Sequence, residues 1–190
     1  MRIPLLRPGS LQEIRDEFDR AENGMRVLLS GLSRQQLSAH PARGGWSIAQ
    51  CLVHLTVTTD AFLPPLAEVL ASLPGGETRV YRLDAAGALL VWLMEPPYRM
   101  RTRTPPRFHP RDLRSADEIA EGFSASQDRV QDLMGRSEGK PLDRARIISP
   151  FNASVRYSAY SALRILAAHQ RRHLWQATRV RAELPRASWS

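Results

Sequence analysis

The residues best suited to chemistry in this chain of 190 residues are its five histidines, His40, His54, His109, His169 and His173. His169 and His173 lie four residues apart in a segment of helical periodicity, so their side chains leave the same face of a helix one turn apart. Arg164, Arg171 and Trp175 lie far from this face, which indicates that the pair points toward the core. The residues that share the face with the two histidines are Ala162, Ile165, Leu166, Gln176, Ala177 and Val180. A metal ion would satisfy both buried imidazoles at once, and a histidine pair at this spacing is a chelating geometry.

A third histidine, His54, strengthens the metal interpretation. On its own predicted helix it shares a face with mostly small residues, Ser47, Gln50, Cys51, Thr58 and Ala61. Together with His169 and His173 it makes a three-histidine set, which leaves coordination positions for water or substrate, as in catalytic zinc sites. Cys51, one turn before His54, is a candidate fourth ligand, and its alternative role is that of a small buried hydrophobe.

The alternative for the three histidines themselves is structural. In that interpretation each imidazole donates a hydrogen bond to a nearby carbonyl or carboxylate and no metal is bound, which is a common use of histidine.

The elements that must position these side chains are helices, because apolar residues recur at three- and four-residue steps and strand alternation is almost absent. Serines with a glutamate or glutamine three residues on predict three helix starts, at Ser10, Ser47 and Ser115. The long helices are predicted at residues 10–30, 47–73, 115–134 and 157–184, with a short buried helix at 85–94. Pro64-Pro65 should kink or restart the second long helix, because proline lacks the backbone donor.

Four long helices joined by connections of very unequal length predict an all-α fold. We expect one domain over residues 1–190, an antiparallel four-helix bundle with a long irregular connection between its second and third helices.

The overall composition excludes several classes of protein. With 43% hydrophobic and 24% charged residues, the chain is neither disordered nor collagen-like, and its single cysteine excludes an intrachain disulfide. A proline and a charge come too early for a signal peptide, and the longest uncharged apolar stretch, residues 85–94, is about half a bilayer span. These features predict a cytoplasmic protein with no membrane partner.

The net charge of +8 raises the question of nucleic-acid binding. All basic residues except Lys140 are arginine, which is more typical of codon bias than of a phosphate-binding surface. The densest run holds Arg99, Arg101, Arg103, Arg107, Arg111 and Arg114. Prolines at 96–97, 105–106 and 110 prevent a continuous basic helix there. We therefore predict that this run is an irregular surface connection and that the protein has no nucleic-acid partner. We expect its arginines either to border the mouth of a pocket or to pair with acidic groups, namely Asp112, Asp117, Glu118 and Glu121.

Two short motifs carry a family resemblance. Trp46-Ser47 with His54-Leu55 seven residues after the serine, and His169-Gln-Arg-Arg-His173-Leu-Trp-Gln176, resemble in order and separation the DinB superfamily of metal-binding four-helix bundles. The resemblance spans nearly the whole chain and implies a divalent metal held by His54, His169 and His173, and a homodimer. Zinc, nickel, iron and manganese all suit imidazole ligands. Gln50 stands where the family often has glutamate, and glutamine serves equally as a capping residue.

The resemblance also implies a function. Characterised relatives include transferases and isomerases that use low-molecular-weight thiols such as bacillithiol or mycothiol, so the implied activity is a metal-dependent transferase with a small-molecule thiol as substrate. The metal would act as a Lewis acid on the thiol, or on water in a hydrolase. Arginines at the pocket mouth would recognise carboxylates of the thiol. The alternative is a non-catalytic metal-binding stress or interaction protein.

Overall fold

The computed structural model describes residues 8–77, 80–97, 104–110 and 115–184. Its elements, in chain order, are α1 (Leu11–Leu29), α2 (Arg34–Ser38), α3 (Ile48–Ala71), α4 (Ala85–Met94), the 3-10 helix η2 (Pro106–Phe108), α5 (Ala116–Gly135), β1 (Arg146–Ile148), β2 (Arg156–Ser158) and α6 (Ala159–Glu183). Helices dominate, and β1 and β2 pair as one small antiparallel sheet. The predicted all-α class is confirmed.

Local sequence signals explain where the long helices begin. Ser10, Ser47 and Ser115 each accept a hydrogen bond from a backbone N–H three residues on, and the side chain there bonds back to the serine N–H. These capping boxes confirm the three predicted starts. Ser158 caps α6 in the same position, and Ser33 caps the short α2, an element that periodicity did not predict.

The proline pair does not restart α3, although a restart is one of the two outcomes that the sequence predicts at this point. Pro64 and Pro65 lie inside one helix, Ile48–Ala71. The side chains of Phe62 and Leu66 on either side of the pair are fully buried. Packing of this face against the core holds the helix where two backbone hydrogen bonds are lost.

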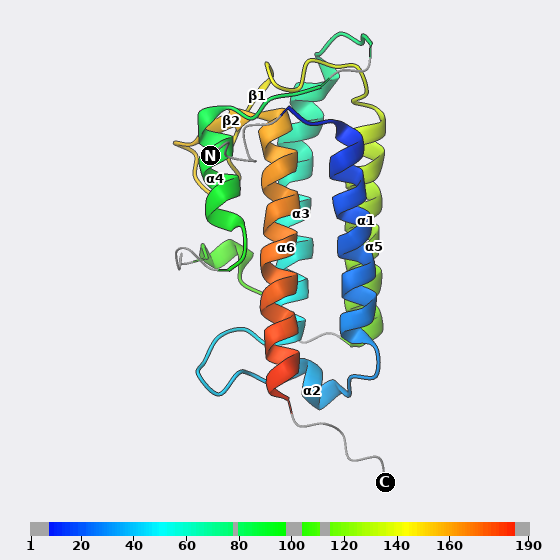
Figure 1. Ribbon diagram of the computed structural model, residues 1–190, viewed down its shortest axis with the longest axis vertical. Coiled ribbons are helices and arrows are strands. Elements are labelled where there is room, and N and C mark those ends of the chain that lie inside the picture. Colours follow the sequence, from blue (N-terminus) through cyan, green and yellow to red (C-terminus); the bar gives the residue numbers. More distant parts are fainter. Residues whose placement is uncertain (1–7, 78–79, 98–103, 111–114, 185–190) are drawn as a thin grey trace.

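The four long helices pack in a ring, in which α3 and α1 each contact both α5 and α6 (Figure 1). Helices α1 and α5 are antiparallel, because Gln131 bonds to Asp19 while Ser124 bonds to Glu22. Helices α3 and α6 are also antiparallel, since the start of α3 lies beside the end of α6 in Figure 1.

The other two neighbouring pairs are parallel. Arg164 of α6 bonds to Glu17 early in α1, and Arg181 at the end of α6 bonds to the carbonyl of Leu28 at the end of α1. It follows that α3 and α5 also run in the same direction (Figure 1). The antiparallel arrangement predicted from the sequence therefore applies to only two of the four pairs. The reason is the long connection after α3, which passes back along the helices and starts α5 at the end where α3 starts.

Helix α4 forms at the predicted residues but is not the buried helix that its apolar sequence suggests. It packs on the outside of α6 (Figure 1), burying Gly87 and Val91. Leu89 is 56% exposed and Trp92 is 42% exposed. Arg171 of α6 donates a hydrogen bond to Glu95, the residue directly after α4, and this contact holds α4 against α6.

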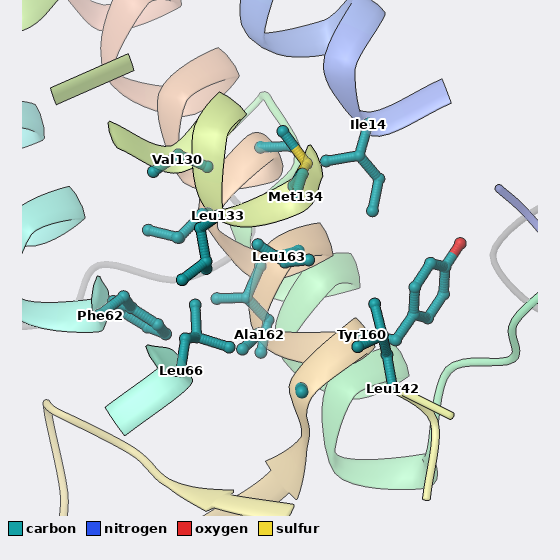
Figure 2. Packing of buried hydrophobic residues seen from close by; sticks show 14 of the residues in the cluster. Ile14, Phe62, Leu66, Val130, Leu133, Met134, Leu142, Tyr160, Ala162 and Leu163 are labelled. Atoms are coloured by element: carbon teal, nitrogen blue, oxygen red, sulfur yellow. The ribbon is translucent and has the colours of Figure 1, made fainter. Parts of the chain in front are cut away.

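Two buried apolar clusters lie between the helices. Figure 2 shows part of the larger one, where side chains from the four long helices meet: Ile14, Phe62, Leu66, Val130, Leu133, Met134, Ala162 and Leu163. Within the part of the chain that is described, no helix combines the length and the apolar character needed to cross a membrane.

The stretch from 135 to 154, which joins the predicted helices 115–134 and 157–184, contains the first strand of the sheet. Ile147 of β1 pairs with Tyr157 of β2, and both are buried. Two strands of three residues are too short for an alternating pattern to stand out in the sequence. Strand β2 ends at Ser158, the residue that caps α6, so the helix begins where the strand ends.

Candidate metal centre

Three of the five histidines meet in one cluster. His54 extends from α3, and His169 and His173 extend from α6, and one ring nitrogen of each lies within 4.8 Å of the others. Their exposed fractions are 2%, 6% and 8%. The structure thus brings together the three side chains that the sequence singled out, and they could hold a metal ion.

Hydrogen bonds at the far side of two rings fix which nitrogen faces the cluster. Nδ1 of His54 lies 2.8 Å from the backbone oxygen of Phe108, and Nδ1 of His173 lies 3.1 Å from Oε1 of Gln176. Since both oxygens only accept, each Nδ1 carries the proton and each Nε2 is left with a lone pair. This is the second-sphere arrangement that orients histidine ligands in metal sites.

The spacing of the inner nitrogens suits a common ion. Nε2 of His54 lies 3.2 Å from Nε2 of His169. Two nitrogens bound at about 2.1 Å from one ion stand about 3.0 Å apart at a right angle and about 3.4 Å apart at the tetrahedral angle. The observed separation falls between these values, so the donor set fits a divalent metal ion.

Burial also keeps the three imidazoles in their metal-binding form. It lowers the pKa of His54 from 6.5 to about 4, opposed by the hydrogen bond to Phe108. Burial, and then the neighbouring histidines, lower the pKa values of His169 and His173 well below 6.5. At neutral pH all three are uncharged, as a metal ligand must be.

A fixed cation on α6 acts in the same direction. The guanidinium of Arg172 is buried and donates to the backbone oxygen of Leu93 at 2.9 Å. Its charge contributes to the low pKa of both His169 and His173. No pattern in the sequence distinguishes Arg172 from its neighbour Arg171, so its effect on the histidines is visible only in the structure.

Aromatic rings enclose the cluster. The ring of Trp46 lies 4.6 Å from that of His54 and stacks on that of His173 at 5.6 Å. The ring of Phe151 lies 6.0 Å from that of His169. Trp46 belongs to the Trp46-Ser47 motif, whereas no sequence pattern distinguishes Phe108 and Phe151.

Cys51, the candidate fourth ligand, and the other two histidines are not part of the cluster. Cys51 packs in the smaller apolar cluster, outside the group of described residues that could hold a metal, and burial raises the pKa of its thiol to about 12. It therefore takes the role of a small buried hydrophobe. His40 and His109 are exposed and bond to the backbone oxygens of Gly45 and Thr104.

Most of the arginine run lies outside the described residues, namely Arg99, Arg101, Arg103, Arg111 and Arg114. The exception is Arg107, an exposed residue of η2 that donates to the backbone oxygen of Pro150. It borders a surface groove, which is one of the two roles predicted for the run. Its hydrogen-bond partner is this carbonyl, in place of the acidic residues that the sequence suggested.

Comparison with known proteins gives a family. A family model described as the DinB superfamily matches residues 17–177, a range that contains all three histidines of the cluster. No curated protein and no solved structure matches the chain.

Proposed function

The chain belongs to the DinB superfamily, and on that premise we propose that His54, His169 and His173 hold one divalent metal ion in a metal-dependent enzyme. The observation that carries the proposal is the convergence of three buried imidazoles, two of which have Nδ1 already bonded to an acceptor. Zinc, nickel, iron and manganese are all compatible with imidazole nitrogen ligands.

The reaction that we propose is transfer of a low-molecular-weight thiol to an electrophilic small molecule, forming a carbon–sulfur bond as the leaving group departs with the thiol proton. A bound divalent ion would supply the Lewis acid that stabilises the thiolate. This reaction is proposed from the family resemblance, and the three-histidine donor set supports it by leaving coordination positions free of protein ligands.

The chain's own residues contribute orientation and exclusion of water. Phe108 and Gln176 hold two of the imidazoles with Nε2 directed inward. Trp46 and Phe151 cover the cluster and lower its local dielectric, which strengthens every charge interaction inside. In this scheme no histidine is a nucleophile, since all three are ligands.

The four long helices supply the rigid support for this site. We propose that they act as a four-helix bundle with one long crossover, so that the ligands from α3 and α6 face each other across an antiparallel pair. A homodimer, a small-molecule thiol substrate and a cytoplasmic location stay predictions from the sequence.

The direct test is the metal content of protein purified without an affinity tag. We expect about one equivalent of a divalent ion in the unaltered protein and none in His169→Ala, which removes one of three ligands. His40→Ala, an exposed histidine outside the cluster, is the matched control and should keep its metal. Metal retained by His169→Ala at the same affinity would contradict the site. Thiol transfer is then assayed with several thiols and electrophiles.

One observation favours a second candidate, a metal-binding protein without catalysis. The three histidines are almost completely buried and Trp46 covers two of them, so an ion there would be enclosed. Exchange of bound water measured by relaxation of a manganese-loaded sample separates the two candidates, since an enzyme needs a position open to substrate.

A further inference from the structure

A surface groove of about 550 Å³ begins one turn beyond the histidine cluster on α3. Val57, Ala61 and Pro65 line it, and they lie on the same stripe of the helix as His54. Its volume lies in the range of small-molecule sites. The opposite wall comes from η2 and from the connection between β1 and β2.

The wall of this groove is mostly apolar. Ile148 of β1 lines it and is 47% exposed, which is unusual for so large an aliphatic side chain. The one hydroxyl group in the lining, that of Ser149, already accepts a hydrogen bond from the backbone N–H of Phe151. The groove therefore offers contact area to an apolar molecule and few hydrogen bonds.

Arg107 is the one cationic residue among the described residues that line this groove. Arg107 is exposed, and its guanidinium is held over the ring of Phe108, 5.0 Å from the ring centre, and bonds to the backbone oxygen of Pro150. Among the described residues, none that lines the groove is acidic and no carboxylate forms an ion pair with Arg107. A guanidinium has five N–H donors, so several remain for a ligand.

Two aromatic residues in contact with each other connect the groove with the histidine cluster. Phe108 lines the groove, and its backbone oxygen holds His54. Its ring lies 4.5 Å from the ring of Phe151, which in turn lies 6.0 Å from the ring of His169. The groove therefore adjoins the histidine cluster, and a molecule bound in it lies next to the proposed metal site.

We propose that this groove binds the electrophilic substrate, and that this substrate is an apolar carboxylic acid. Its hydrocarbon part lies against Val57, Ala61 and Ile148, and its carboxylate pairs with Arg107, whose planar donors match two carboxylate oxygens. A small polar thiol does not suit such a wall. The inference rests on the proposed function only in naming the occupant a substrate, since binding itself does not require the metal.

The test is calorimetric titration of the purified protein with decanoate and with decanamide, a neutral probe of the same length, both below the concentrations at which they aggregate. We expect one saturable site that binds decanoate at least tenfold more tightly than decanamide. In Arg107→Gln this preference should vanish, whereas Arg156→Gln, an exposed arginine outside the groove, should keep it.

A second pair of variants tests the apolar wall. Ala61→Phe fills the groove and should weaken both probes at least tenfold, whereas Ala67→Phe, on the exposed side of the same helix, should not. Ile148→Ser is the milder variant if Ala61→Phe does not fold, and it should weaken both probes as well. Absence of saturable binding, or an unchanged preference in Arg107→Gln, would overturn the inference.

The same titration on His169→Ala keeps the two proposals apart. We expect decanoate to bind this variant as it binds the unaltered protein, because His169 does not line the groove. If this variant no longer binds decanoate, the inference that the groove binds its ligand without the metal is wrong. If the proposed metal site is wrong, His169→Ala retains its metal, whatever the decanoate titration shows.

Discussion

At the scale of single residues, the hydrogen-bond partners of the histidines matter as much as the histidines. Gln176 accepts from Nδ1 of His173, and that bond sets the tautomer that turns Nε2 toward the cluster. Replacing Gln176 by leucine removes the acceptor but none of the three ligands. We expect metal affinity to fall about 10- to 100-fold, measured by competition with a chelating dye.

The matched control for this change is Gln35→Leu, which alters an exposed glutamine of α2 in the same way. It should leave the affinity unaltered. Equal affinities in Gln176→Leu and Gln35→Leu would show that the bond to His173 has no part in metal binding.

The pKa of His54 predicts how the stability of the metal-free protein depends on pH. Burial lowers this pKa from 6.5 to about 4, so between these values the unfolded chain binds more protons than the folded protein. The free energy of unfolding is therefore highest above pH 6.5 and falls as the pH drops toward 4. His54 alone accounts for about 2 kcal/mol between pH 7 and pH 5.

Urea unfolding of chelator-treated protein at pH 7 and pH 5 measures this loss. It should be smaller in His54→Gln, which has no imidazole to protonate, and unchanged in His40→Gln, the exposed control. The same loss in all three proteins would rule out His54 as its source.

At the scale of elements, the close packing of α4 on α6 depends on a glycine. A Cβ atom on Gly87 would stand 2.2 Å from Oγ of Ser161, far inside contact distance. Asp84 caps α4 and also accepts a hydrogen bond from the backbone N–H of Ser158, the residue that caps α6. One carboxylate therefore contacts the starts of both helices. Displacing one helix start therefore disturbs the other.

We expect Gly87→Ala to lower the free energy of unfolding by about 1–3 kcal/mol, because α4 must move away from α6. Gly24→Ala in α1 is the control, since its Cβ would stand 3.7 Å from Leu174. There the better helix propensity of alanine should raise stability by up to about 1 kcal/mol. Urea unfolding measures both, and equal shifts in the two variants would contradict the packing argument.

At the scale of the whole molecule, the net charge of +8 is distributed and partly neutralised. Arg26, Arg129 and Arg164 form ion pairs with acidic residues, and they lie on three different helices. Such a distribution differs from the single basic face that binds a phosphate backbone. We therefore expect no saturable binding of random duplex or single-stranded DNA at physiological ionic strength, measured by gel-shift titration.

A variant with Arg99, Arg101, Arg103 and Arg107 changed to glutamine tests the densest run directly. Submicromolar DNA binding by the unaltered protein that this variant loses would contradict the prediction and give the run a nucleic-acid partner.

What the sequence determined by itself is local. Helix starts depend on a serine and a residue three positions on, and the facing of His169 and His173 depends on spacing within one helix, so both were predictable. The donor set was predictable as well, because residue type limits which side chains bind metals. The helix predicted over residues 47–73 does not restart at its proline pair, since tertiary packing supports a helix that local propensity disfavours.

What only the tertiary structure decided concerns groups far apart in the chain. The parallel course of α3 and α5 follows from the path of the connection between them, which no helical periodicity encodes. The oxygen that holds His54 belongs to the backbone of Phe108, and a backbone carbonyl is the same in every residue. The groove needs α3, η2 and β1 side by side. Such contacts arise from the packing of whole elements, so residue types and spacing alone do not reveal them.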